Sequence, residues 1–167
     1  MDLQQVKQDI ESWIMNFVEV PHPALGGWPP CPYARSARLK KSYEVYLGTD
    51  PLYDLKHVSR WGLQGREVVI YAYNPVEWPS GLFAASVDTA NRAMLLPKDI
   101  IALPDHPADP EIVNGVCMNQ GTYALALVQS LSDLNVKARL IADRGFYHGW
   151  QEHYLQELFQ HRQDPRS

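Results

Sequence analysis

The feature that most constrains the fold is a series of short apolar strands separated by amphipathic helices. Residues 67–73 read EVVIYAY, a nearly continuous apolar run typical of a strand that is buried on both faces. The pattern predicts strands over 43–47, 67–73 and 100–103, and helices over 51–62 and 80–95 between them. Strands that alternate with helices predict an α/β (or α+β) fold with one small, partly parallel sheet of three to four strands flanked by helices. A ferredoxin-like arrangement is the alternative.

The two ends of the chain add further helices to this plan. Apolar residues at helical spacing predict an amphipathic helix over 2–19, and Pro32 favours a short helix from Cys31 to about Leu39. In the C-terminal third we expect a helix over 122–134, a fourth strand over 136–142 and a final helix over 147–162. A length of 167 residues fits one domain, 1–167.

Composition narrows the class of partner. The net charge of −4 argues against general nucleic-acid binding, and no apolar run is long enough for a membrane span. The N-terminus lacks the basic and apolar regions of a secretory signal, so we expect a cytoplasmic protein with two reduced cysteines, Cys31 and Cys117. We predict no cofactor and no metal.

One segment differs in charge from the rest of the chain. Residues 20–43 contain no acidic residue but four basic ones, Arg35, Arg38, Lys40 and Lys41. Such a segment favours an anionic small molecule, for which Arg35 and Arg38 are the candidate ligands. The alternative is a solvated basic face that pairs with acidic residues elsewhere in the fold.

Cys31 lies within this segment, at the expected start of a helix. A thiol at a helix N-terminus, with Arg35 one turn away, is expected to have a lowered pKa and therefore a larger thiolate fraction. This reasoning makes Cys31 a candidate nucleophile or ligand contact. A buried structural cysteine in a loop braced by prolines is the competing interpretation.

The tetrapeptide Cys31-Pro32-Tyr33-Ala34 resembles the active-site motif of glutaredoxins and of cysteine-type glutathione transferases. The resemblance implies that Cys31 attacks or holds glutathione, and we count Tyr33 among the candidate ligand contacts. Because Ala34 occupies the place of a second cysteine, dithiol chemistry is excluded.

The layout of the chain is also similar to a family of uncharacterised small bacterial proteins. Members begin with an amphipathic helix, carry a Cys-Pro-Phe-Ala-like motif and have a later strand that ends in a His-Pro loop. Here these features are the helix over 2–19, the tetrapeptide at Cys31 and the segment LPDHP at 103–107. The resemblance implies a shared fold.

A second candidate region follows the strand at 100–103, since ligands of open α/β sheets bind beyond the carboxyl ends of strands. His106 is the candidate general base, with Asp105 or Asp109 to orient it. Asn119 and Gln120 precede the helix expected from 122, whose free N–H groups would hold a phosphate or carboxylate. Surface-loop and capping roles are the alternatives for all of these residues.

Three readings of function follow. The first is an enzyme assisted by the Cys31 thiol, or a binder of an anionic small molecule, with one pocket made by the Cys31–Arg38 segment and residues 105–111. The second is a non-catalytic interaction module, with a homo-oligomer as its expected form. The third is a glutathione-linked redox protein. The stripe of His153, Glu157 and His161 on the final helix is interpreted as a solvated polar face rather than a metal site.

Overall fold

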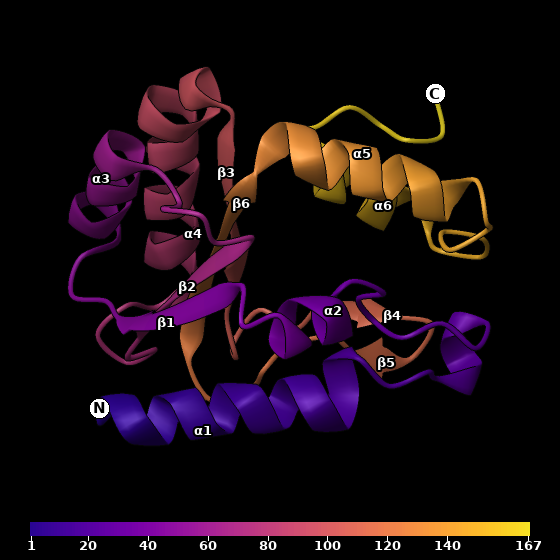
Figure 1. Cartoon of the computed structure of the whole chain (residues 1–167), viewed down its shortest axis with the longest axis horizontal. Coiled ribbons are helices and arrows are strands. Elements are labelled where there is room, and N and C mark those ends of the chain that lie inside the picture. Colours follow the sequence, from indigo (N-terminus) through magenta and orange to yellow (C-terminus); the bar gives the residue numbers. More distant parts are fainter.

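The computed structural model describes residues 1–167 and contains a four-stranded mixed sheet flanked by helices (Figure 1). The strands of this sheet are β1 (Tyr43–Leu47), β2 (Val68–Tyr73), β3 (Ile100–Asp105) and β6 (Ala124–Ser130). A small hairpin is formed by β4 (Ile112–Val113) and β5 (Val116–Cys117). The helices are α1 (Leu3–Trp13), α2 (Ala34–Leu39), α3 (Pro51–Trp61), α4 (Ser80–Ala90), α5 (Leu131–Ala142) and α6 (Glu152–Leu158). The predicted α/β class is confirmed, and no helix is long and apolar enough to cross a bilayer.

The order of the strands in the sheet is β1-β2-β6-β3. β1 and β2 are parallel, while β6 is antiparallel to both of its neighbours, so β2 and β3 run in the same direction. Parallel strands need long crossover connections, which α3 and α4 supply. The prediction of a partly parallel sheet is therefore confirmed. The ferredoxin-like alternative is wrong, because a helix separates β2 from β3 where that fold joins the corresponding strands directly.

The surroundings of β2 explain why its sequence is apolar at nearly every position. Val69, Tyr71 and Tyr73 belong to a cluster of 14 buried residues with α3 and α4 on one face of the sheet. Ile70 and Ala72 point to the other face, where they join a cluster of eight buried residues that includes the inner side of α1. Alternate residues of a strand face opposite sides, so a strand covered on both sides has no position for a solvated side chain.

The C-terminal third corrects three predictions. The expected helix over 122–134 is strand β6 up to Ser130, and the expected strand over 136–142 belongs to α5. Alanine and leucine, both of which favour helices, alternate through the first half of β6. Pairing with both β2 and β3 nevertheless makes this segment a strand. The Ser130 side chain then accepts the Asp133 N–H and caps α5. The final helix is shorter than the predicted 147–162, because only Glu152–Leu158 is helical.

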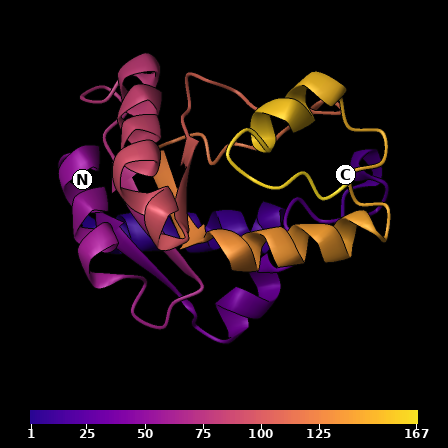
Figure 2. The same cartoon turned by 90° about the horizontal axis from the view of Figure 1, so that it is seen from above.

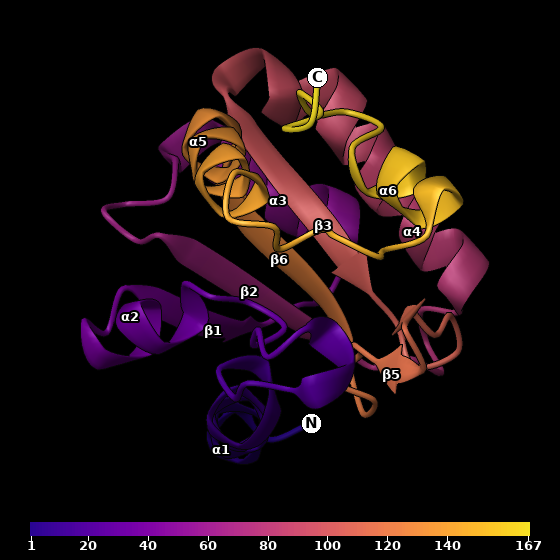
Figure 3. The same ribbon diagram turned by 90° about the vertical axis from the view of Figure 1, so that its right-hand side faces the viewer.

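The N-terminal predictions hold more closely. Asp2 caps α1 through the Gln5 N–H, and the helix continues as a wider π-helical segment, Ile14–Val18, so that helical structure spans 3–18. The short helix after Cys31 is also present, but it starts only at Ala34. Both helices lie on the side of the sheet opposite α3 and α4, and Figures 2 and 3 show α5 and α6 projecting on that same side.

A buried asparagine ties α4 to the edge strand β3. Asn91 follows the last residue of α4, and its amide group donates to the Ala102 carbonyl and accepts the Ala102 N–H, both at 2.8 Å. The Asn91 side chain is thus hydrogen-bonded to the peptide groups of β3 in the way that a neighbouring strand would be.

Candidate functional site

Two adjoining cavities lie over the face of the sheet opposite α3 and α4. The first, called here the thiol cavity, has a volume of about 180 Å³ and is lined by Cys31 together with residues of α1, α2, β1, β2, β6 and α5. The second, called here the acidic cleft, has a volume of about 580 Å³ and lies between β3, the β4–β5 hairpin and α6. Trp13 and Leu127 line both cavities and form the wall that they share.

Cys31 is held at the thiol cavity by its backbone. Its N–H donates to the Val18 carbonyl at 3.0 Å, and its carbonyl accepts the Ala34 N–H at 3.2 Å. Tyr33 occupies the N-cap position of α2, so Cys31 precedes the helix by three residues instead of capping it. The segment before Cys31 forms a short 3-10 turn, Pro23–Leu25, and not the strand that precedes the cysteine of glutaredoxins. Glutathione-linked chemistry stays a prediction.

The electrostatics at Cys31 differ from the expectation based on a helix start. Burial raises the pKa of the Cys31 thiol, and the nearby backbone N–H groups of Tyr33 and Ala34 oppose this effect without overcoming it. The neutral thiol is therefore the favoured form at neutral pH. Cys31 contributes a small, polarisable group to the cavity wall.

The polar side of the thiol cavity is an ion-pair network. Lys137 of α5 contacts Glu67 at 3.1 Å and Asp133 at 2.8 Å, and its ammonium lies 5.4 Å from the centre of the Tyr33 ring. Hydrogen bonds from Ser42 and Lys137 lower the pKa of Glu67. Because the single cation at the cavity is already paired with two carboxylates, it offers little attraction to an anionic ligand.

The acidic cleft contains a carboxyl group in an apolar setting. Glu111 accepts a hydrogen bond from the Tyr154 hydroxyl at 3.1 Å, and burial raises the pKa of Glu111 to about 6. Burial also raises the pKa of Asp105, against the hydrogen bonds that its carboxylate accepts from Gln120 and Asn119. Asp109 and Glu157 line the same cleft. This cleft thus gathers carboxyl groups from β3, from the loop after it and from α6.

Asp105, Asn119 and Gln120 form a closed network that fastens the hairpin to the sheet. Asp105 accepts the Asn119 amide at 2.7 Å and the Gln120 N–H at 2.9 Å. Asn119 also donates to the carbonyls of His106 and Asp109 and accepts the Glu111 N–H. Gln120 and Asn119 precede a strand here, so the helix N-terminus expected to hold an anion at 122 does not exist.

His106 is buried and both of its ring nitrogens are in use. Nδ1 accepts the Ala108 N–H at 3.0 Å, which places the ring proton on Nε2, and Nε2 lies 2.9 Å from the Trp78 carbonyl. A histidine with this tautomer has no free lone pair for a substrate proton. His106 lines neither cavity.

The remaining candidates are divided in space. Tyr33 lines the thiol cavity, and its hydroxyl donates to the Lys137 carbonyl. Arg38 forms a two-fold hydrogen bond with Glu19, at 2.6 and 2.8 Å, while Arg35 is exposed and lies outside both cavities. The structure thus brings the Cys31 segment and the 105–111 loop to opposite sides of one wall, without Arg35, Arg38 or His106.

Several residues of the two cavities are not predictable as site residues from the sequence. The predicted helices over 2–19 and 122–134 include Trp13 and Leu127, and the predicted strand over 136–142 includes Lys137, but none of these patterns indicates a cavity. Large apolar residues and single lysines occur at many core and surface positions. No local sequence pattern therefore distinguishes the residues that line these cavities. Across the chain, no group of three or more His, Cys, Asp or Glu side chains converges in a way that would hold a metal ion.

No family model, curated protein or solved structure matched this chain in the comparisons.

Proposed function

We propose that this protein binds a small, mostly apolar, uncharged molecule in the thiol cavity. The carrying observation is that an apolar pocket of about 180 Å³, partly open to solvent, remains over the sheet, where close packing would otherwise be expected. Empty apolar cavities of about 150 Å³ stay dry and accept molecules such as benzene. A cavity of this size and lining is therefore suited to a ligand of one or two rings.

The lining supports an uncharged ligand. Twelve of the 15 lining residues are hydrophobic, and the charged groups, Lys137 and Glu67, neutralise each other. A charged ligand would need an unpaired group of opposite charge, and the cavity offers none. The apolar surface that a neutral ligand buries supplies the binding free energy.

The same features weigh against a thiol enzyme. The Cys31 thiol has a raised pKa, and no histidine lines the cavity to deprotonate it. We infer a binding role for the cavity, with Cys31 as one of its walls.

Alkylation of Cys31 provides the test. In a Cys117→Ser background, where only Cys31 carries a thiol, N-ethylmaleimide labelling is followed by mass spectrometry with and without ethylbenzene as the probe. We expect ethylbenzene to slow labelling by about fivefold or more in a saturable way, because occupancy excludes the reagent.

Two matched variants complete the experiment. Ala37→Leu places extra carbons in the cavity and is expected to abolish protection, whereas Ala85→Leu adds the same carbons on the exposed side of α4 and is expected to preserve it. Protection that is absent in the parent protein, or that survives Ala37→Leu unchanged, contradicts the proposal.

A further inference from the structure

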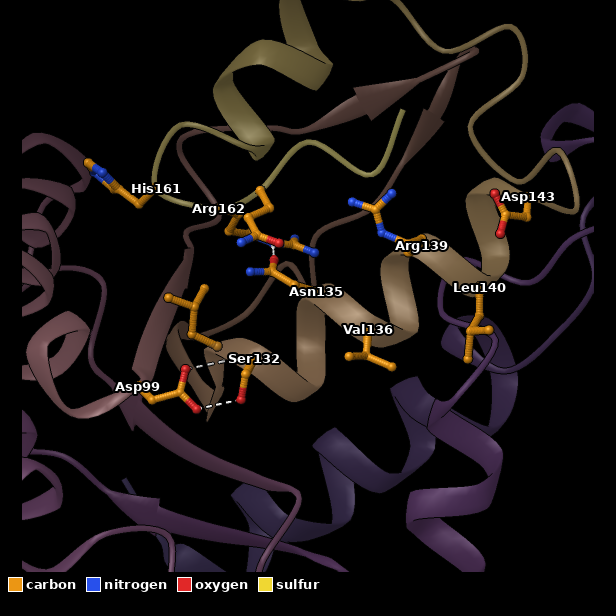
Figure 4. Close-up of a pocket in the computed structure, with 11 residues that line it drawn as sticks. Asp99, Ser132, Asn135, Val136, Arg139, Leu140, Asp143, His161 and Arg162 are labelled. Carbon is orange, nitrogen blue, oxygen red and sulfur yellow. Dashed lines mark hydrogen bonds between the residues drawn. The ribbon is translucent and has the colours of Figure 1, made fainter. Parts of the chain in front are cut away.

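A third cavity lies on the opposite side of α5, between this helix and the segment that follows α6 (Figure 4). It has a volume of about 540 Å³, and only three of its 11 lining residues are hydrophobic. Leu134 and Lys137 of α5 face the thiol cavity, while Asn135 and Arg139 line this one, so the helix separates the two. We call this third cavity the arginine cleft.

Arg162 is the central residue of the arginine cleft. Its guanidinium lies 4.9 Å from the centre of the Phe159 ring, and its Nε donates to the Asn135 side-chain oxygen at 3.3 Å. No carboxylate lies within ion-pair distance of it. Burial lowers the pKa of Arg162, which is the effect expected of a cation removed from water without a counter-charge.

The other arginines show that this situation is unusual in the molecule. Arg38, Arg66, Arg92 and Arg166 each pair with a carboxylate. The remaining unpaired arginines are exposed, and water compensates their charge. Arg162 alone combines partial burial with the absence of an acidic partner, and it is oriented by a ring on one side and an amide on the other.

Arg139 adds a second guanidinium to the same cleft. It projects from α5 one turn beyond Asn135 and forms no hydrogen bond or ion pair. Figure 4 shows Asn135, Arg162 and Arg139 in the middle of the cleft, with Asp99 and Asp143 toward its two ends. Asp99 is already engaged, since it accepts the N–H and the hydroxyl of Ser132.

We propose that the arginine cleft binds the oxyanion group of a small molecule, with Arg162 and Arg139 as the residues that hold it. Guanidinium groups donate parallel N–H bonds that match phosphate and carboxylate oxygens. The Asn135 side-chain NH2 group lines the cleft and offers a neutral hydrogen bond beside them, since only its oxygen is engaged by Arg162. This site is independent of the thiol cavity, and its failure would leave the proposed function untouched.

Isothermal titration calorimetry at constant ionic strength tests the site with two probes, pyrophosphate and citrate. We expect saturable binding of at least one probe to the full chain, and the tighter one identifies phosphate or carboxylate as the preferred group. Arg139→Gln and Arg162→Gln are each expected to weaken binding by about tenfold or more, as for loss of a charge-assisted hydrogen-bond partner. Arg144→Gln, which removes an exposed charge outside the cleft, is expected to change binding by less than about twofold.

A further variant guards against a purely structural role for Arg162. Arg162→Lys retains the charge over Phe159 but loses the fork of donors, so it is expected to fold and still bind the probe more weakly. The proposal is overturned if neither anion binds saturably, if Arg144→Gln weakens binding as much as Arg162→Gln, or if Arg162→Lys binds like the parent protein.

Discussion

The two faces of the sheet are packed in different ways. Against α3 and α4, β2, β3 and β6 bury a single continuous cluster of 14 residues. On the other face the buried residues fall into separate clusters of eight, six and three. The thiol cavity and the acidic cleft are lined by the same elements that contribute these clusters. The same strands therefore support a sealed face that holds the fold together and an open face that leaves room for ligands.

The largest expected effect tests the sealed face. Phe83→Ala removes a fully buried ring of α4 and is expected to lower the free energy of unfolding by about 3–5 kcal/mol, from lost burial and the new cavity. Leu134→Ala, at the already open wall of the thiol cavity, is expected to cost about 1 kcal/mol, because less surface is buried there. Urea denaturation measures both, and equal losses would remove the distinction between the faces.

A smaller effect is expected at His106, whose ring lies beside that of Phe83 on the sealed face. His106→Ala leaves the Trp78 carbonyl and the Ala108 N–H without their partners, which costs about 2–3 kcal/mol in total. Equilibrium denaturation measures this loss, and ethylbenzene protection of Cys31 is followed in the same variant. Unchanged stability together with lost protection would show that His106 serves the ligand and not the fold.

The smallest effect concerns the acidic cleft on the open face. The pKa of Glu111 is raised to about 6 in the folded chain, so the folded state holds its proton more tightly than the unfolded state does. The contribution of Glu111 to the free energy of unfolding is fully present below the pKa of the unfolded chain, near 4.5. This contribution is lost as the pH rises through about 6.

Glu111→Gln removes this titration while keeping a neutral side chain of the same shape. We expect the free energy of unfolding of the variant to fall less between pH 5 and pH 7.5 than that of the parent, by on the order of 1–2 kcal/mol. Glu77→Gln, at an exposed carboxylate, serves as the control. Identical pH profiles for parent and Glu111→Gln would place Glu111 in water.

Sequence patterns predicted the sealed face well and the open face poorly. α3, β2 and α4 carry strong local signals, such as the Asp50 cap and the apolar run of β2, and these agree with their tertiary partners. β6 was missed because its alanines and leucines suit a helix, and only its two neighbouring strands override that preference.

The candidate site was predicted in outline only. The sequence pointed to Cys31 and to the 105–111 loop, and both border the cavities. The roles assigned to single residues depended on long-range partners that no local pattern reveals. Glu19 neutralises Arg38, and Trp78 and Ala108 occupy both nitrogens of His106. The N-cap of α2 is Tyr33, not Cys31, so the expected helix-terminal effect on the thiol is missing.

The amide of Asn91 has a consequence for how copies of this chain behave at high concentration. An edge strand with free peptide groups is a template for strand addition by another molecule, and native proteins block such edges to avoid aggregation. By occupying the N–H and carbonyl of Ala102, Asn91 closes the middle of the β3 edge. The opposite edge, β1, ends in exposed Tyr46 and Leu47, so intermolecular sheet extension has one open end instead of two. We therefore expect strand addition by a second copy to use the β1 edge rather than the β3 edge.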